Sequence, residues 1–171
     1  NQVGQTEQKE YVYVPEYLEL DDNTNSSYSN MTVQGDKLYY TNYQWDEASG
    51  ESKVLLGTYS LTDGSREDLP ITINADGGGI YSMQADAEGN IYTAEFEWNA
   101  TEGDDAYTQQ TTVLHKYDAS GTELVTQDIT DIMQQDENNS YVGSMCLDDQ
   151  GRFYISSDSL IRLFGSDGQF P

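Results

Sequence analysis

The chain has almost no cysteine and few basic residues, and both shortages exclude classes of protein. One cysteine among 171 residues rules out a disulfide within the chain. Seven Lys and Arg stand against 31 Asp and Glu, which gives a formal net charge of −24. A surface of that sign repels the phosphates of nucleic acids and anionic lipid head groups, so neither is an expected partner.

Other absences narrow the chemistry. His115 is the single histidine, so no Ser-His-Asp set can be assembled, and no zinc-type spacing or Gly-rich phosphate loop is present. Cys146 is expected to lie buried in an inner strand as a small hydrophobe, apart from His115. We therefore expect no cofactor and no metal. No apolar run reaches the length of a transmembrane helix, and we expect any targeting signal to lie outside this chain.

Sustained helical periodicity is also missing, and the best helical candidate, residues 128–135, is short. What is present is alternation in runs rich in Tyr, Thr and Val. In the run Ile91–Trp98, the odd positions from Ile91 to Glu97 fall on one side and the even positions from Tyr92 to Trp98 on the other. That period of two is typical of a β-strand. The sequence predicts an all-β fold.

A unit of several strands occurs three times. Met31, Met83 and Met145 open the copies, 52 and 62 residues apart. A glycine turn follows in each copy, then a hydrophobic-aromatic pair, then a further strand that ends at an Asp or Ser/Gly turn. The matching glycines and pairs are Gly35, Gly89 and Gly151, with Leu38-Tyr39, Ile91-Tyr92 and Phe153-Tyr154. Such a repeat is the signature of a β-propeller blade, although three unrelated hairpins in a sandwich would also account for it.

The repeat divides the chain into a flexible tether, three blades and a segment that precedes them. Residues 1–10 are polar and form the tether, and residues 11–28 form a closing strand and loop. Blade 1 spans 29–79, blade 2 spans 80–140 and an incomplete blade 3 spans 141–171. The predicted fold is a partial β-propeller of about three four-stranded antiparallel blades.

Three blades are too few for a closed ring, because propellers close with roughly four to eight. We expect the chain to be a fragment of a larger ring, or else to pair with a second copy. Open blade edges offer a route to self-association, and a compact sandwich would need neither.

The repeats also resemble a known family. The run YVYVPEYLEL (11–20), followed by SMQADAEGNIYTAEFEW (82–98) and SMCLDDQGRFYISS (144–157), resembles the NHL or YWTD-like propeller region of large surface lipoproteins of gut Firmicutes. In that family the propeller is associated with extracellular solute-binding domains of the ABC-transporter type. The resemblance implies an extracellular, cell-surface location through a lipid anchor outside this chain.

Acidic residues suggest two kinds of site, each with a simpler explanation. Asp86–Asn90 and Asp148–Gly151 contain oxygen ligands that Ca²⁺ prefers, but hairpin turns capped by Asp explain them without a metal. Glu95 and Glu97 could act as a glycosidase pair, since residues two apart on a strand are about 6–7 Å apart. On so acidic a chain a solvated strand face is the simpler expectation.

Two tryptophans are the best candidates for ligand contact. Trp45 and Trp98 each end the second strand of a copy beside an acidic loop, and aromatic faces stack on sugars and peptide side chains. We expect a non-catalytic extracellular binding or scaffold module that captures a carbohydrate or a peptide. The alternatives are a carbohydrate-active propeller enzyme and a purely structural assembly module.

Overall fold

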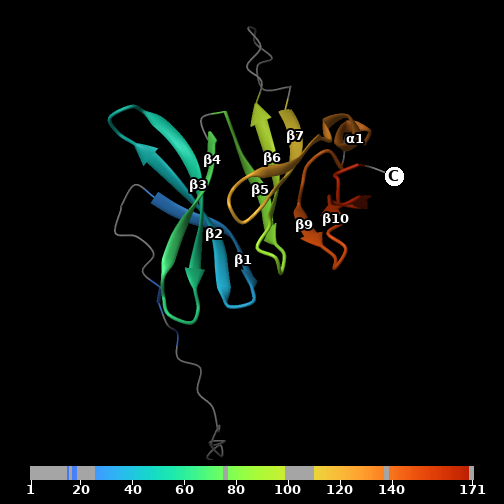
Figure 1. The fold of residues 1–171 in the computed structure, drawn as a ribbon. Coiled ribbons are helices and arrows are strands. Elements are labelled where there is room, and N and C mark those ends of the chain that lie inside the picture. The colour runs from blue at the N-terminus through green and yellow to red at the C-terminus, as the bar shows by residue number, and fades with distance from the viewer. Residues whose placement is uncertain are drawn as a thin grey trace, which may run out of the picture.

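The structure is a computed structural model, and it describes most of the chain outside the N-terminal segment. The described residues are Pro15, Tyr17, Leu18 and the ranges 26–74, 77–98, 110–136 and 139–169. The tether expected at 1–10, most of the closing strand and loop expected at 11–28, and the acidic loop at 99–109 lie outside them. Figure 1 shows three sheets arranged like an open fan.

Sheet A is a meander of four antiparallel strands in the order β1-β2-β3-β4. These strands are β1 (Ser26–Gln34), β2 (Lys37–Asp46), β3 (Glu51–Ser60) and β4 (Arg66–Asn74). Short turns join each strand to the next, which is why neighbours in sequence are neighbours in the sheet.

Sheet B repeats the same meander in the order β5-β6-β7-β8. Its strands are β5 (Gly78–Ala85), β6 (Ile91–Trp98), β7 (Gln110–Tyr117) and β8 (Glu123–Asp128). The strand expected at 91–98 is confirmed as β6.

Sheet C has three strands among the described residues, in the order β11-β10-β9. They are β9 (Ser144–Leu147), β10 (Phe153–Ser156) and β11 (Ile161–Phe164), and the short helix α1 (Thr130–Gln134) precedes them. The prediction of an all-β chain with one short helix near 128–135 is confirmed. In the described part of the chain, no helix combines the length and apolar character needed to cross a membrane.

The sheets lie side by side through their first strands, with β1 beside β5 and β5 beside β9 (Figure 1). Side chains bridge these strands. Thr32 Oγ1 donates a hydrogen bond to Gln84 Oε1 (3.3 Å), and Gln84 Nε2 donates to the carbonyl of Met145 (3.2 Å). The backbone N–H of Met145 donates to Ser82 Oγ (3.3 Å). The strand ladders of the described residues each stay within one sheet, so side chains make the connection from sheet to sheet.

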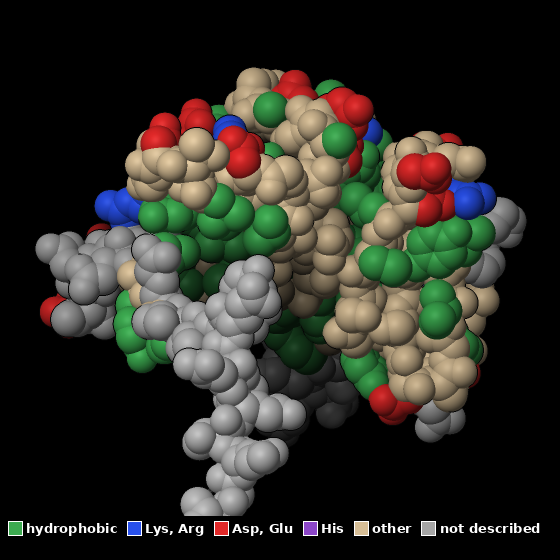
Figure 2. Space-filling model, turned by 90° about the horizontal axis from the view of Figure 1, so that it is seen from below, with side chains coloured by type: hydrophobic (Ala, Val, Ile, Leu, Met, Phe, Trp, Pro, Cys, Tyr) green, Lys and Arg blue, Asp and Glu red, His purple; other side chains and the backbone are tan. Residues whose placement is uncertain are grey.

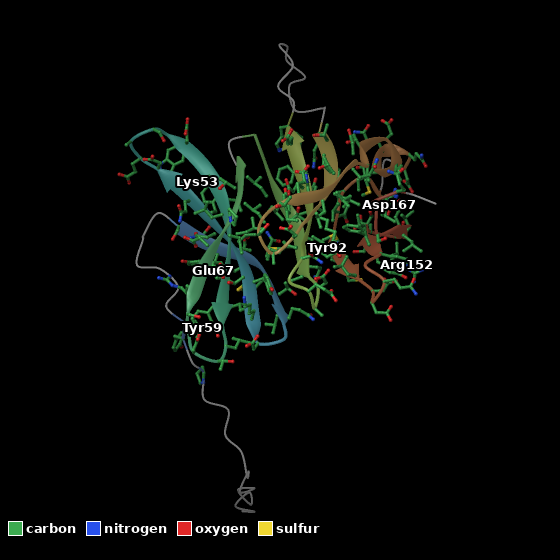
Figure 3. The ribbon with its side chains drawn as sticks, in the orientation of Figure 1. Lys53, Tyr59, Glu67, Tyr92, Arg152 and Asp167 are labelled. Atoms are coloured by element: carbon green, nitrogen blue, oxygen red, sulfur yellow. The ribbon has the colours of Figure 1, made fainter. Side chains whose placement is uncertain are left out.

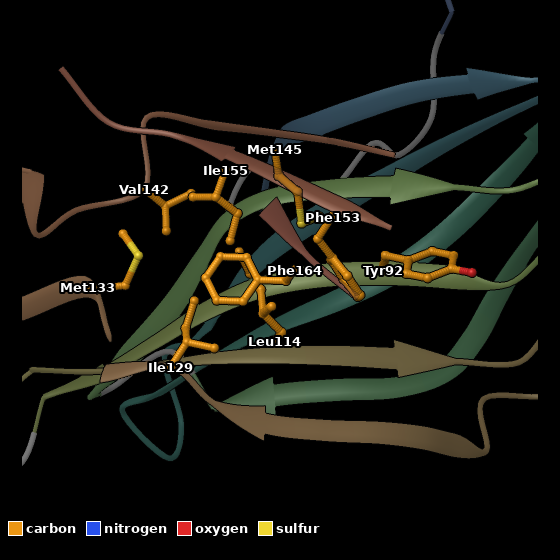
Figure 4. Close-up of a cluster of buried hydrophobic side chains, with 10 residues drawn as sticks. Tyr92, Leu114, Ile129, Met133, Val142, Met145, Phe153, Ile155 and Phe164 are labelled. Atoms are coloured by element: carbon orange, nitrogen blue, oxygen red, sulfur yellow. The ribbon is translucent and has the colours of Figure 1, made fainter. Parts of the chain in front are cut away.

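Two hydrophobic cores fill the spaces between the sheets. The core between sheets A and B consists of residues from both, namely Tyr39, Leu56, Leu69, Ile71, Met83, Ile91 and Tyr117. The core between sheets B and C is the larger, and Figure 4 shows Phe164 lying among Leu114, Ile129 and Phe153. Sheet B is therefore covered on both faces, which explains why the alternation in β6 does not separate a buried side from a solvated side.

Candidate functional site

The turn between β5 and β6 is built around the carboxylate of Asp86. Its Oδ1 accepts the backbone N–H groups of Glu88 (3.0 Å) and Asn90 (2.9 Å). Its Oδ2 accepts Asn90 Nδ2 (2.7 Å) and the hydroxyl of Tyr92 (2.9 Å). The aspartate thus fixes the turn and joins it to the following strand.

The turn between β9 and β10 repeats this arrangement around Asp148. Oδ1 accepts the N–H groups of Gln150 (2.9 Å) and Arg152 (3.0 Å), and Oδ2 accepts Arg152 Nε (2.6 Å) and the Tyr154 hydroxyl (3.2 Å). Figure 3 shows Arg152 on the outside of sheet C. Desolvation acts to raise the pKa of Asp148, but the hydrogen bonds and charge of Arg152 outweigh it and lower that pKa to about 2.

These contacts account for both aspartates without a metal. Desolvation opposes ionisation of Asp86, yet hydrogen bonds from Asn90 and Tyr92 still hold its pKa below the usual value. Both oxygens of each carboxylate already accept hydrogen bonds inside their own turns. Within the described ranges, no group of three or more His, Cys, Asp or Glu is placed to hold a metal ion.

A cavity of about 700 Å³ lies where these two turns approach each other, between sheets B and C. Charged side chains on its walls include Asp86, Glu88, Lys116 and Asp148. Lys116 Nζ lies 5.0 Å from the centre of the Tyr92 ring. Gly151 closes one side with φ +72°, and a Cβ there would come within 3.3 Å of the Tyr92 hydroxyl. The lining is polar and could bind hydroxyl or amide groups.

Glu95 is buried, which corrects the expectation of a solvated face for the pair Glu95 and Glu97. Only 9% of Glu95 is exposed, whereas Glu97 is exposed. Glu95 Oε1 accepts the hydroxyls of Thr93 (2.5 Å) and Tyr117 (3.3 Å), which compensates its desolvation. Burial raises the pKa of Glu95, and the nearby His115 acts in the opposite direction. The two glutamates share an orientation on the strand but differ in environment, because Glu95 lies beside Tyr117 and His115 whereas Glu97 is near the exposed end of β6.

His115 lies between two carboxylates on this face of sheet B. Its Nε2 is 3.6 Å from Glu95 Oε2, and its Nδ1 is 3.2 Å from Glu123 Oε2. The imidazole stacks on the Tyr117 ring with centroids 5.6 Å apart. These contacts give His115 a structural place beside the core of sheets A and B. Cys146 is exposed, contrary to the expectation of a buried thiol, because it lines the cavity between the two aspartate turns.

Trp45 and Trp98 hold matching positions at the ends of β2 and β6, and each is 43% exposed. Trp45 lines a cavity of about 530 Å³ at the β2–β3 hairpin, together with Asp46, Glu51 and Lys53 (Figure 3 labels Lys53). Trp98 packs edge-on against Phe96, with ring centroids 6.3 Å apart. The two tryptophans therefore hold equivalent positions in successive sheets. Of the described residues that line the cavity, only Trp45 is a tryptophan.

Sequence reasoning missed the bond between each turn aspartate and a tyrosine six residues later. The spacing is visible in the sequence, since Asp86 precedes Tyr92 as Asp148 precedes Tyr154. The cavity between the turns could not be found in the same way, because it depends on how sheets B and C approach each other.

No protein-family model matches this chain, and a search of curated proteins also finds no match.

Proposed function

We propose that this protein is a non-catalytic extracellular binding module, built as part of a β-propeller, and that it captures a carbohydrate or peptide at the rim that carries Trp45 and Trp98. The propeller assignment is supported by three consecutive antiparallel meanders that lie side by side through their first strands. Attachment to a cell surface through a lipid anchor outside this chain follows from the family resemblance and belongs to the same proposal.

The observation that carries the binding role is the recurrence of a half-exposed tryptophan at the same strand end in two successive sheets. A large aromatic side chain left partly in water costs free energy that burial would recover. Around Trp45 the cavity offers an apolar ring beside carboxylates and an ammonium group. An apolar face with polar groups at its edge is complementary to a sugar ring, which has C–H faces and hydroxyl edges.

A carbohydrate-active enzyme is the second candidate, because carboxylates line the cavity between sheets B and C. A glycosidase needs one carboxylic acid whose pKa is raised so that it stays protonated. Asp86 and Asp148 have lowered pKa values instead, and both are used within their turns. Glu95 has a raised pKa, but it is not among the described residues that line this cavity. These features favour binding over hydrolysis.

The test uses the two tryptophans, the only ones in the chain, as reporters. Trp45→Phe leaves Trp98 as the single fluorophore, and Trp98→Phe leaves Trp45. We expect a panel of soluble oligosaccharides and peptides to contain a ligand that shifts the emission of Trp45. Trp45→Ala should weaken that ligand about tenfold or more, as expected for a lost stacking contact.

Leu124→Ala is the matched control, because Leu124 is 53% exposed on β8 and lies outside the Trp45 cavity. Equal weakening by Leu124→Ala, or a panel without any ligand, would contradict the proposal. Shortened oligosaccharide products after incubation would instead support the enzyme.

A further inference from the structure

The two contacts between sheets are built from the same positions of the repeat. Sheet B faces sheet A with Met83, Ala85, Ile91 and Tyr117. Sheet C faces sheet B with the residues at the matching positions, Met145, Leu147, Phe153 and Phe164. The opposite partner in each contact supplies a tyrosine and a leucine, which are Tyr39 and Leu56 in sheet A and Tyr92 and Leu114 in sheet B. The interface therefore has two complementary halves that recur in order.

Sheet A exposes the first half of this interface on its outer side. The matching residues, here called the Met31 face, are Met31, Val33, Leu38 and Tyr59. Met31 is 61% exposed, whereas Met83 is 3% exposed. Figure 3 shows Tyr59 at the edge of sheet A, at the opposite end of the fan from Arg152. Sheet A thus carries the first half of the interface, but no sheet of the described chain packs against Met31.

Sheet C exposes the second half. The matching residues are Tyr154 and Ile161. Leu163 pairs with Tyr154 and lies on the same side of sheet C, and these three residues are here called the Ile161 face. Ile161 is 70% exposed, whereas the leucines at its position in the other sheets, Leu56 and Leu114, are fully buried. Seen from below, hydrophobic side chains gather over sheet A and again over sheet C (Figure 2). One molecule therefore carries both halves of its own repeating interface, at opposite ends.

A buried polar atom also lies on the Met31 side of sheet A. Asn42 lies on β2, on the same side of the strand as Leu38 and Tyr40. In the repeat it holds the position that Glu95 occupies in sheet B. Asn42 is buried. Among the described residues, its Oδ1 is the only buried side-chain nitrogen or oxygen atom without a hydrogen-bond partner. It lines a polar cavity of about 260 Å³ with Arg66 and Asp68. A buried carbonyl of this kind needs a donor.

We propose that a second copy of this chain covers both faces, with the Met31 face of each copy seated on the Ile161 face of the other. Each contact is head-to-tail and continues the pattern of the two contacts within the chain. Two such contacts related by a twofold axis close a ring of six sheets, which is within the range of propellers. The occupant is a second copy because the Met31 face, together with Tyr154 and Ile161, occupies the positions of the repeat that are already packed between sheets A, B and C.

Charge sets the conditions under which this dimer forms. Each copy carries a net charge of −24, so two copies repel each other and salt screens the repulsion. The dimer should therefore strengthen as ionic strength rises, as expected for an apolar contact between like-charged partners. The dimer does not require a ligand at Trp45, so the molecular mass in solution tests it directly.

Light scattering on a size-exclusion column, from about 1 to 100 µM protein in 0.15 M and 0.5 M salt, tests it. The wild-type chain should have twice the monomer mass of 19.2 kDa. Met31→Glu and Ile161→Glu should each reduce the mass to that of the monomer. Leu61→Glu is the control, because Leu61 is half exposed in the β3–β4 turn and belongs to neither face, and it should remain a dimer.

An equimolar mixture of Met31→Glu and Ile161→Glu separates head-to-tail pairing from other modes. One copy then keeps an intact Ile161 face and the other an intact Met31 face, so one of the two contacts can form and part of the dimer should return. A wild-type monomer at every concentration overturns the proposal. So does a dimer that survives Ile161→Glu, which would place the contact elsewhere, such as strand pairing at a sheet edge. Circular dichroism of each variant confirms that the chain is folded.

Discussion

At the scale of single residues, Glu95 shows how position in a stack of sheets sets the chemistry of a side chain. It lies on β6 two residues from Glu97, yet Glu95 is buried and Glu97 is exposed to water. Burial raises the pKa of Glu95, and its neighbours Thr93, Tyr117 and His115 favour the ionised form. Whether the Glu95 carboxylate stabilises or destabilises the folded state depends on the balance between its desolvation and these contacts.

Glu95→Gln should stabilise the protein at pH 8 and have less effect at pH 5. A carboxyl whose folded pKa is raised contributes stability in full below its unfolded value near 4.5, and loses it as pH rises through the folded pKa. Glutamine keeps an oxygen for the Thr93 and Tyr117 hydroxyls and carries no charge at any pH. We expect a gain of about 1 kcal/mol at pH 8, measured by urea unfolding at both pH values.

Glu97→Gln is the control for this prediction, since Glu97 is exposed on the same strand. It should change the free energy of unfolding little at either pH. Should Glu95→Gln destabilise the protein at pH 8, the ionised Glu95 beside His115 would be a net stabilising contact.

At the scale of elements, the aspartate turn is the local device that starts the second strand of sheets B and C. Asp86 and Asp148 each bind two backbone N–H groups of the turn and a tyrosine hydroxyl on the strand that follows. The corresponding turn of sheet A has Gly35-Asp36 between β1 and β2 and is shorter. In sheets B and C the aspartate side chain therefore fixes where the pairing of the first and second strands begins.

Asp86→Ala should destabilise the protein by about 1–2 kcal/mol, because it removes the acceptor of several hydrogen bonds, among them the largely buried Tyr92 hydroxyl. Partial exposure of the carboxylate keeps the loss near the lower figure. The lowered pKa of Asp86 means that its contribution is present above pH 4 and falls as the carboxylate is protonated. The difference between wild type and variant should therefore shrink below pH 4 in thermal unfolding.

Glu88→Ala is the matched control, since Glu88 lies in the same turn with its side chain exposed and contributes its backbone N–H to Asp86. It should leave the midpoint of unfolding nearly unchanged. A loss equal to that of Asp86→Ala would mean that general acidity, and not the hydrogen bonds of Asp86, stabilises the turn.

At the scale of the whole molecule, equivalent positions should respond alike to truncation. Leu56 and Leu114 are fully buried in the two cores and hold the same place in the repeat. Leu56→Ala and Leu114→Ala should each cost about 2–5 kcal/mol, through lost burial and the cavity left behind. Leu61→Ala, in an exposed turn, should cost little.

Guanidinium unfolding that monitors Trp45 in sheet A and Trp98 in sheet B separately, in the two single-tryptophan variants, measures these costs. Both probes should report one transition, because sheet B shares a core with each neighbour. Two separate midpoints would show that the sheets unfold as independent units.

Much of this architecture could be predicted from the sequence. Alternation identified β6 with its bounds, and the recurrence of Met31, Met83 and Met145 identified the three-fold repeat of strands. The side on which each residue is buried could not be predicted, because it depends on which sheet faces it. Glu95 is buried beside Tyr117 and His115, and Cys146 is exposed and lines the cavity between the two aspartate turns.

The candidate sites divide in the same way. Trp45 and Trp98 were identified from their places in the repeat, a property that the sequence holds by itself. The cavity between the β5–β6 and β9–β10 turns could not be predicted from the sequence. It depends on the distance between two sheets, which the packing of the core sets in the folded chain.

The bridges between the first strands have a consequence for how such a chain can change over generations. Side chains such as Thr32, Gln84 and Ser82 make the hydrogen bonds that cross from one sheet to the next, while every strand ladder of the described residues closes within its own sheet. A gene duplication that copies one whole sheet would carry its ladder and both halves of the interface with it. The number of sheets can therefore grow or shrink by whole units without breaking the pairing of any strand.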